Sequence, residues 1–328
     1  VVPWAMAIAL RSRGQFYEQS IGVDFAAKMA GGQESHGAAP GYYLALMTLT
    51  LWPVTLFLIP AIAGAVRARA EPAVRFLLCW IVPCWLMFEL VPTKLPHYVL
   101  PVYPALAILA ALWALGGKPK ESRLDRVLFW AAPVQFLVAA AALTAAVVVL
   151  PGIYGSGILW WQTALVALFF TFCIVAVAAY ARRLALTAAF AAFAAALVLY
   201  PTVTAGVAPS LEKLWISPRA AAAVRVLSRP GDPPPAAVGY HEPSLLFLLG
   251  TKTRLANARD AADVGAEAGG LVLVDSRQVP LFLGRLAERE ADAHTVGTVD
   301  GFNYSKGRPV RLRIFRVTPV REWTPPQE

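Results

Sequence analysis

The residues best suited to chemistry lie in the segment Thr93–Pro104, which reads TKLPHYVLPVYP. It places Lys94, His97 and Tyr98 at the edge of an apolar stretch of membrane-span length. A charged group beside hydrocarbon is costly, so an ionisable side chain there predicts a functional site. A lysine beside a span can hold a lipid phosphate and stabilise a leaving group that develops negative charge. The segment therefore predicts a binding site at the membrane edge.

A second interpretation of Lys94 stays open. Prolines at 96, 101 and 104 remove backbone donors and favour a break in the helix. Lys94 could simply extend to the lipid interface, and the tyrosines could form an aromatic belt. Glu89 favours a site, because a carboxylate close to the end of a span usually has a partner, and Lys94 is the obvious candidate.

A second group of polar residues lies between positions 11 and 40. Carboxylates such as Asp24 and Glu34 can act as general bases or bind a metal, and Arg11 can hold a phosphate. Asp24 and Lys28 have the i, i+4 spacing that is also typical of a solvated helix pair. Glu34 and His36 are flanked by glycines, which is typical of an ordinary loop. A divalent metal could bind near Glu34 and His36, but two ligands do not make a site.

Composition indicates an integral membrane protein. Of the 328 residues, 58% are hydrophobic and only 15% are charged, and the mean hydropathy is +0.57. A soluble domain of this size is less apolar. The net charge of +9 is assigned to cytoplasmic loops that face lipid head groups, not to a nucleic-acid interface. The three cysteines lie in apolar stretches and predict neither a disulfide framework nor a zinc site.

The chain divides into three parts. Residues 1–40 combine the end of a span with an outer loop, in which Gln15–Met29 could form an amphipathic helix at the interface. Residues 41–207 hold six predicted membrane helices, and residues 208–328 form a separate domain. The predicted spans are Tyr42–Val66, Phe76–Val91, Tyr98–Leu115, Val127–Leu150, Ile158–Ala181 and Leu184–Val207.

Charge in the loops orients these spans. Alternate loops are rich in arginine and lysine, and the positive-inside rule places them in the cytoplasm. Thr93–Pro96, Pro151–Gly157, the loop before residue 40 and the C-terminal domain then lie on the outer side. The basic residues concerned are Arg67, Arg69, Arg75, Lys118, Lys120, Arg123, Arg126, Arg182 and Arg183.

The C-terminal domain is predicted to be α/β. Ser217 and Pro218 predict the start of a helix, with Ser217 as its N-cap. The expected strands are Ala236–Tyr240, Gly270–Asp275, Val296–Val299 and Val310–Val317. The helices expected between them are Glu242–Leu249, Ala258–Ala268 and Val279–Glu290.

Three segments together resemble bacterial membrane glycosyltransferases of the family 39/83 type. They are GGQESHGAAPGYYL (Gly31–Leu44), KLPHYVLPVYPAL (Lys94–Leu106) and YHEPSLLFLLGT (Tyr240–Thr251). The family includes aminoarabinose transferases of lipid A and, more distantly, protein O-mannosyltransferases. The resemblance implies a GT-C fold: an α-helical polytopic protein of the bacterial inner membrane with a small periplasmic α/β domain. It also implies a polyprenyl-phosphate sugar donor and a lipid A, other lipid or protein acceptor.

The same resemblance suggests roles for individual residues. Lys94 and Tyr98 match the KLPxY element that lines the donor cavity, and Arg11 loosely matches a phosphate-contacting arginine. His97 stands at a variable position. The family's catalytic aspartate lies in a first periplasmic loop that has no counterpart here, so the chain is expected to be a C-terminal portion without its catalytic base.

Two other functions remain open. A transporter or flippase for a lipid-linked substrate would favour internal repeats and charges deeper in the spans, and the sequence shows neither. A non-catalytic membrane scaffold would use the outer α/β domain for binding, which agrees with the lack of a catalytic motif in that domain.

Overall fold

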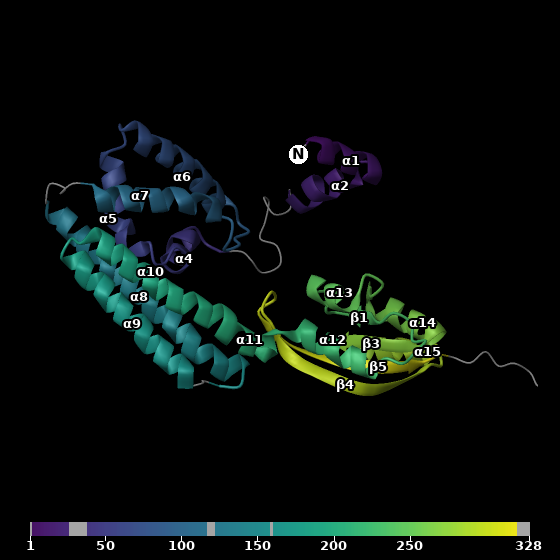
Figure 1. Cartoon of the computed structure of the whole chain (residues 1–328). Coiled ribbons are helices and arrows are strands. Elements are labelled where there is room, and N and C mark those ends of the chain that lie inside the picture. Colours follow the sequence, from purple (N-terminus) through teal and green to yellow (C-terminus); the bar gives the residue numbers. More distant parts are fainter. Residues whose placement is uncertain (1, 26–37, 117–121, 158–159, 320–328) are drawn as a thin grey trace, which may run out of the picture. The chain divides into compact units, whose positions relative to one another are not determined.

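The computed structural model describes residues 2–25, 38–116, 122–157 and 160–319. The chain forms two compact units, a helical unit of residues 1–149 and 158–208 and a C-terminal unit of residues 150–157 and 209–328 (Figure 1). The predicted fold class, a helical membrane protein with a small α/β domain, is confirmed.

The helical unit is built from α-helices interrupted by short 3₁₀ and π segments. The prolines account for several of the interruptions, because proline has no amide hydrogen to donate to the preceding turn. Its elements are α1 (Val2–Ser12), α2 (Gln15–Tyr17), η1 (Glu18–Phe25), α4 (Tyr42–Thr50), α5 (Thr55–Arg67), α6 (Pro72–Leu90), η2 (Leu100–Val102), α7 (Tyr103–Leu115), α8 (Arg123–Tyr154), α9 (Trp160–Ala181), α10 (Ala185–Pro201) and η3 (Thr202–Val207).

Four of the described helices are long and apolar enough to cross a membrane: Pro72–Leu90, Arg123–Tyr154, Trp160–Ala181 and Ala185–Ser210. The other two predicted spans are shorter as helices. The first is divided into α4 and α5 around Pro53, and the third is reduced to Leu100–Leu115, which begins after Pro96. The predicted interfacial helix is described as far as Phe25, in α2 and η1.

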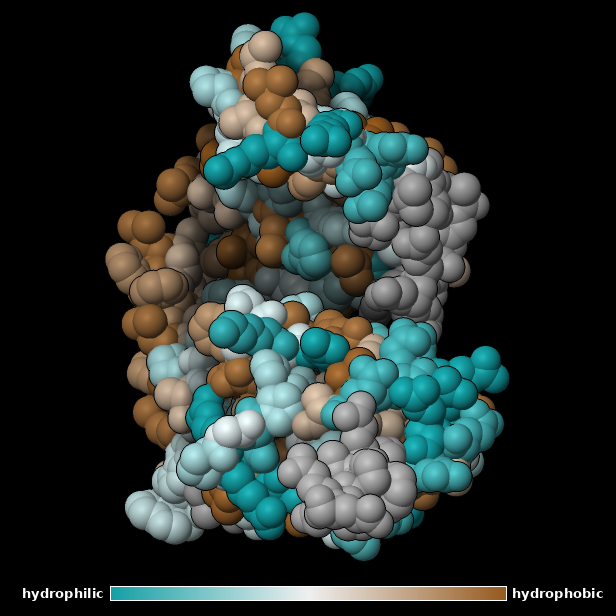
Figure 2. Space-filling model, turned by 90° about the vertical axis from the view of Figure 1, so that its right-hand side faces the viewer, coloured by the Kyte–Doolittle hydropathy of each residue, from teal (hydrophilic) through white to brown (hydrophobic). Residues whose placement is uncertain are grey.

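Small residues bring α9 and α10 together. Ala176 and Ala179 of α9 and Ala188, Ala192 and Ala195 of α10 are all buried. In lipid, small side chains let helix backbones approach closely. Large apolar side chains on the same helices, such as Phe190 and Phe193, are instead exposed, as on a lipid-facing surface. Figure 2 shows hydrophobic residues concentrated along the left-hand edge of the surface, whereas hydrophobic and hydrophilic residues are mixed elsewhere on this face.

The helices α4, α5, α6 and α7 share one hydrophobic core. Tyr43 and Leu58 are fully buried in it, together with Val99 and Val102 from the connection between α6 and α7. This connection is therefore held on the core by its own apolar residues. Its polar residues are fixed at the end of α6 as a consequence.

The C-terminal unit contains a five-stranded sheet with the order β2-β1-β3-β5-β4. The strands β1, β2 and β3 are parallel, whereas β5 pairs antiparallel with β3 and β4. Helices cover both faces of the sheet (Figure 1). The elements are α12 (Ile216–Leu227), β1 (Ala236–Val238), α13 (Pro243–Leu249), β2 (Arg254–Ala256), α14 (Ala258–Ala268), β3 (Gly270–Asp275), α15 (Val279–Glu288), β4 (Asp292–Asn303) and β5 (Arg308–Thr318).

Alternating side chains give this sheet two cores. On one face, Val272 and Val274 of β3 pack with α14 and α15. On the other face, Leu271 and Leu273 pack with α12 and Leu245 of α13. The period of two along a strand produces this division. All six residues of β3 are buried, which is why the run GLVLVD predicts its bounds correctly.

The start of α12 differs from the prediction. The helix begins at Ile216 with Trp215 as N-cap, so Ser217 does not cap it. The Ser217 side chain is buried, and its Oγ atom lies 2.9 Å from the Tyr240 hydroxyl and 2.8 Å from Ser244 Oγ. These contacts join α12 to the segment after β1, a tertiary interaction that outweighs the local capping preference.

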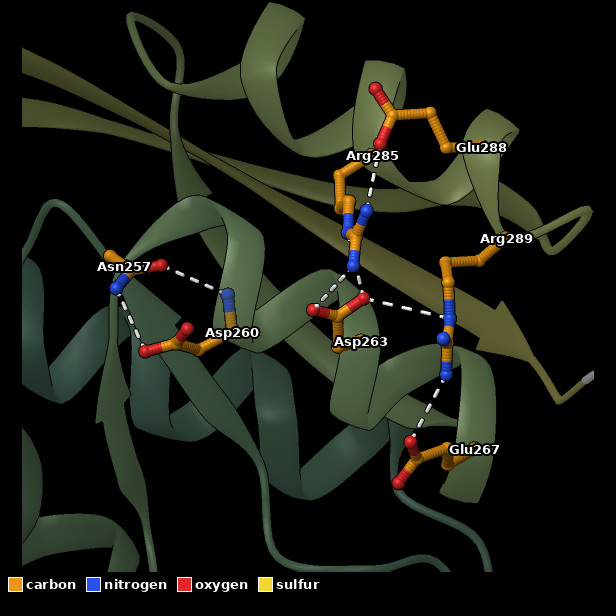
Figure 3. A network of polar contacts seen from close by, with 7 residues as sticks. All are labelled: Asn257, Asp260, Asp263, Glu267, Arg285, Glu288 and Arg289. Atoms are coloured by element: carbon orange, nitrogen blue, oxygen red, sulfur yellow. Dashed lines mark hydrogen bonds and ion pairs between the residues drawn. The ribbon is translucent and has the colours of Figure 1, made fainter.

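Helices α14 and α15 are joined by a network of charged side chains (Figure 3). Arg285 donates to both carboxylate oxygens of Asp263, at 2.8 and 3.1 Å, and to Glu288. Arg289 lies 3.6 Å from Asp263 and 3.1 Å from Glu267. The hydrogen bonds from Arg285 lower the pKa of Asp263 below its usual range. The network fixes the relative position of the two helices that cover one face of the sheet.

Candidate functional site

Lys94 is buried at the carboxyl end of α6. Its ammonium donates hydrogen bonds to the main-chain oxygens of Phe88 at 3.1 Å, Glu89 at 2.7 Å and Val91 at 3.1 Å. Only 1% of the side chain is exposed. The last carbonyl groups of a helix have no partner within the helix and carry the negative end of its dipole. Lys94 therefore caps α6 from the segment that follows it.

Glu89 is the carboxylate of this site. Its Oε2 atom lies 3.6 Å from Lys94 Nζ and accepts a hydrogen bond of 2.9 Å from the Gly41 amide. The predicted pairing of Glu89 with Lys94 is confirmed. Its other oxygen, Oε1, is buried and has no hydrogen-bond partner within the described parts of the chain. The pair thus connects the start of α4, the end of α6 and the segment after it.

Tyr43 completes the surroundings of the ammonium. Its ring centroid lies 5.4 Å from Lys94 Nζ, within the range of a cation–π contact. Its hydroxyl donates a hydrogen bond of 3.2 Å to the Leu95 carbonyl oxygen. Sequence reasoning did not assign Tyr43 to the site. The available signal was the Tyr42–Tyr43 pair directly after Pro40 and Gly41, at the outer end of the first predicted span.

His97 and Tyr98 extend the site toward its surface. His97 is exposed, and Tyr98 is half-buried. The two rings meet edge to face with centroids 5.0 Å apart, and Tyr98 also packs on Phe88 at 5.2 Å. The Tyr98 amide donates to the Leu95 oxygen, which makes a tight turn after Pro96. Of these two rings, His97 is the more exposed.

The arrangement gives Lys94 a positioning role. An ammonium has three N–H donors, and here all three are directed to backbone oxygens. To contact a phosphate directly, Lys94 would have to release at least one of them. Binding of a donor phosphate by Lys94 stays a prediction, because the described contacts neither include nor require it.

The remaining predicted residues are not brought to this site by any described contact. Arg11 is exposed in the last turn of α1. Asp24 lies on η1, and Lys28, Glu34 and His36 fall outside the described residues. Within the described ranges, no group of three or more histidine, cysteine, aspartate or glutamate residues could hold a metal ion. The metal considered near Glu34 and His36 remains untested.

Comparison with known sequences finds similar transferases. The chain is 29% identical over 159 residues to an undecaprenyl phosphate-alpha-4-amino-4-deoxy-L-arabinose arabinosyl transferase of Pectobacterium carotovorum, which covers 47% of the chain and 28% of the relative. It is 36% identical over 110 residues to the protein of the same name from Erwinia tasmaniensis, covering 33% of the chain and 20% of the relative. No family model matches the chain. The alignments thus span about a quarter of these relatives' length.

Comparison with solved structures identifies the fold. The crystal structure of ArnT from Cupriavidus metallidurans bound to undecaprenyl phosphate matches 95% of the chain with a TM-score of 0.61 and 14% identity, and 58% of that structure is covered. Its apo state matches with a TM-score of 0.62. The chain therefore shares the fold of this part of ArnT. The sequence resemblance to aminoarabinose transferases is likewise confirmed.

Proposed function

We propose that this chain is part of a membrane glycosyltransferase that moves a sugar from a polyprenyl-phosphate donor to lipid A or another acceptor of the bacterial envelope. The observation that carries the proposal is the match of its fold, over 95% of the chain, to an enzyme crystallised with undecaprenyl phosphate. The sequence relatives named for transfer of 4-amino-4-deoxy-L-arabinose support an aminopentose as the sugar. Because only 58% of the ArnT structure is matched, the proposal concerns the part that these residues build.

The proposed orientation places the site on the periplasmic face of the inner membrane. The arginine-rich ends of α5, α8 and α9 then face the cytoplasm, as the positive-inside rule requires. The segment with Lys94, His97 and Tyr98 and the C-terminal domain come to lie on the opposite side. A lipid-linked donor and an envelope acceptor could both reach the site there.

Within this site, Tyr98 and His97 are proposed to contact the sugar or its phosphate. The His97 ring is exposed and the Tyr98 ring half-buried, and Tyr98 is held against Phe88. Lys94 is proposed to act as a positioning residue that fixes the segment bearing them. Lys94 is also predicted to contact the donor phosphate. For that contact, its ammonium would release one of the three main-chain carbonyl oxygens when the donor binds.

A transfer assay tests the proposal. The complete gene that encodes this chain would be expressed in membranes, with an undecaprenyl-phosphate-linked aminopentose as donor and lipid A as acceptor. Tyr98→Ala and His97→Ala should lower transfer at least about tenfold, the effect typical of a lost binding or proton-transfer group. Tyr304→Ala and His294→Ala, which change exposed residues of the C-terminal unit, are matched controls that should leave transfer unchanged.

Two outcomes would contradict the proposal. If the wild-type protein transfers no sugar from any polyprenyl-phosphate donor, the transferase assignment is wrong. If transfer occurs but Tyr98→Ala and His97→Ala retain it fully, the assignment of the site to this segment is wrong. Correct membrane insertion, checked by protease protection of the C-terminal domain, must accompany either result.

A further inference from the structure

A cavity lies at the other end of the helical unit from the Lys94 site. It has a volume of about 790 Å³ and is bounded by the end of α5, the end of α7, the start of α8 and the segment after α9. All of these residues belong to one compact unit. Three arginines from three separate segments meet in its wall: Arg67, Arg126 and Arg183. Sequence reasoning used these residues only to orient the spans.

The described part of this cavity's lining carries more positive than negative side chains. Among the residues that the structure describes, its lining holds the three arginines and one carboxylate, Asp125. Asp125 is already engaged, because it contacts Arg67 and accepts a hydrogen bond of 2.7 Å from Ser122 Oγ. The Ser122 hydroxyl in turn accepts from the Asp125 amide, which completes the cap of α8. Arg126 and Arg183 are exposed, and their guanidinium groups provide donors that suit a phosphate group.

The inner wall of the cavity is apolar and aromatic. Pro60, Ala63 and Gly64 line it, together with Trp113 and Phe129. Phe129 is fixed by stacking on Tyr180 at 4.5 Å and carries the Arg183 guanidinium 4.9 Å above its ring. The cavity therefore offers a charged rim above an apolar wall. A phosphate anion attached to a hydrocarbon chain matches both parts.

The backbone at Arg183 adds a second indication. Arg183 has a φ of 60°, in the left-handed region that glycine normally occupies at the end of a helix. Its amide donates to the Tyr180 oxygen, and the next amide donates to the Ala179 oxygen, which completes the turn that ends α9. An arginine at this position is unfavourable compared with glycine. Its presence there agrees with a use for its side chain at the cavity.

We propose that this cavity binds the phosphate group of an anionic phospholipid from the leaflet that faces the arginine-rich loops. In the orientation given above, that leaflet is the cytoplasmic one. Basic pockets between membrane helices on this side are suited to anionic lipid head groups. The site is separate from Lys94 and His97, and its occupation does not depend on the proposed transferase activity.

The test is a lipid-binding titration of the intact chain in neutral detergent, followed by native mass spectrometry. Phosphatidylglycerol should bind more tightly than phosphatidylcholine. Arg126→Gln and Arg183→Gln should each weaken phosphatidylglycerol binding by about fivefold, the loss expected for one basic residue near a lipid surface. Inorganic phosphate should not displace the lipid, because it lacks the apolar part that contacts Trp113 and Phe129.

Two neighbouring arginines provide matched controls. Arg123 lies on α8 and Arg182 follows α9, and neither lines the cavity. Arg123→Gln and Arg182→Gln remove the same charge from the same segments and should leave binding unchanged. An equal loss in all four variants would show a diffuse charge effect and overturn the proposal. Displacement by inorganic phosphate would assign the site to a soluble phosphate compound and overturn its lipid part.

Discussion

Lys94 and Glu89 meet twice in this protein, since the Lys94 Nζ atom lies 2.7 Å from the main-chain oxygen of Glu89 and 3.6 Å from its carboxylate. The contact with the main-chain oxygen caps α6, and the contact with the carboxylate balances the charge of the buried Lys94 ammonium. Two charges taken out of water are stable only if good geometry and further hydrogen bonds compensate for their desolvation. Here the Gly41 amide and the Tyr43 ring supply part of that compensation.

Loss of the ammonium should destabilise the helical unit. Lys94→Met keeps the length of the side chain but takes the positive charge from the Glu89 carboxylate, which keeps only the Gly41 amide, and the donor from three carbonyl groups. We expect the free energy of unfolding to fall by about 3 kcal/mol, the usual cost of breaking a buried ion pair. Thermal unfolding in detergent, followed by circular dichroism, measures the change.

The double variant Lys94→Met, Glu89→Gln separates charge from shape. It removes the unpaired carboxylate, so it should recover part of the stability that Lys94→Met loses. If the two single changes are simply additive in the double variant, the residues are not coupled and the pairing is of no energetic importance.

The Tyr43 hydroxyl should fix the segment that carries His97 and Tyr98. Tyr43→Phe removes one hydrogen bond, to Leu95, at a cost of about 1 kcal/mol. Backbone amides of residues 92–99 should then exchange with deuterium faster. Tyr42→Phe is the matched control and should leave exchange there unchanged. Equal exchange in Tyr43→Phe and the wild type would mean that the apolar residues of the connection alone hold it.

Much of the fold follows from local sequence patterns. The strand Gly270–Asp275 is predicted with correct bounds because its apolar run LVLV is short and lies between a glycine and an aspartate. The strand Arg254–Ala256 is missed, because it is short and its first two residues are exposed. It is a strand because it pairs with β1, and the sequence of residues 254–256 alone does not indicate that pairing.

The site follows from the sequence only in part. The Glu89–Lys94 pair is predictable, because the two residues are close in sequence and both are costly beside lipid. The contacts of Lys94 with the backbone depend on where α6 ends, and those with Tyr43 depend on how α4 packs. The cavity lined by Arg67, Arg126 and Arg183 also depends on how the helices pack. The positions of these arginines in the sequence therefore do not predict it.

Gly239 should be irreplaceable in the C-terminal unit. It has a φ of 74°, and a Cβ atom there would lie 2.9 Å from the Asp275 Cβ atom. Gly239→Ala should therefore cost about 1–3 kcal/mol from backbone strain, and more from the clash. Gly231→Ala is the control, because Gly231 has a φ of 90° but open space around it. Urea titration of the intact chain would compare them, and equal losses would show that the contact with Asp275 is unimportant.

The pairing of Asp232 with Arg316 should make the stability of the C-terminal unit depend on pH. Arg316 holds both oxygens of Asp232 at 3.1 and 3.2 Å and also contacts the Leu227 oxygen, so it ties β5 to the linker after α12. These hydrogen bonds are the main cause that lowers the pKa of the Asp232 carboxyl in the folded protein. Asp232→Asn should reduce the free energy of unfolding by about 1 kcal/mol near neutral pH, a modest value because the pair is partly exposed.

The sign of the pH effect follows from the lowered pKa. The contribution of Asp232 is complete above the pKa of the unfolded chain, about 3.9, and is lost as the pH falls through the lower pKa of the folded state. The stability difference between the wild type and Asp232→Asn should therefore be constant from neutral pH down to about 4 and shrink below it. Urea titrations of the intact chain at a series of pH values measure this difference. A difference that stays the same down to the acid transition would mean that Asp232 stabilises the unit by its shape and not by its charge.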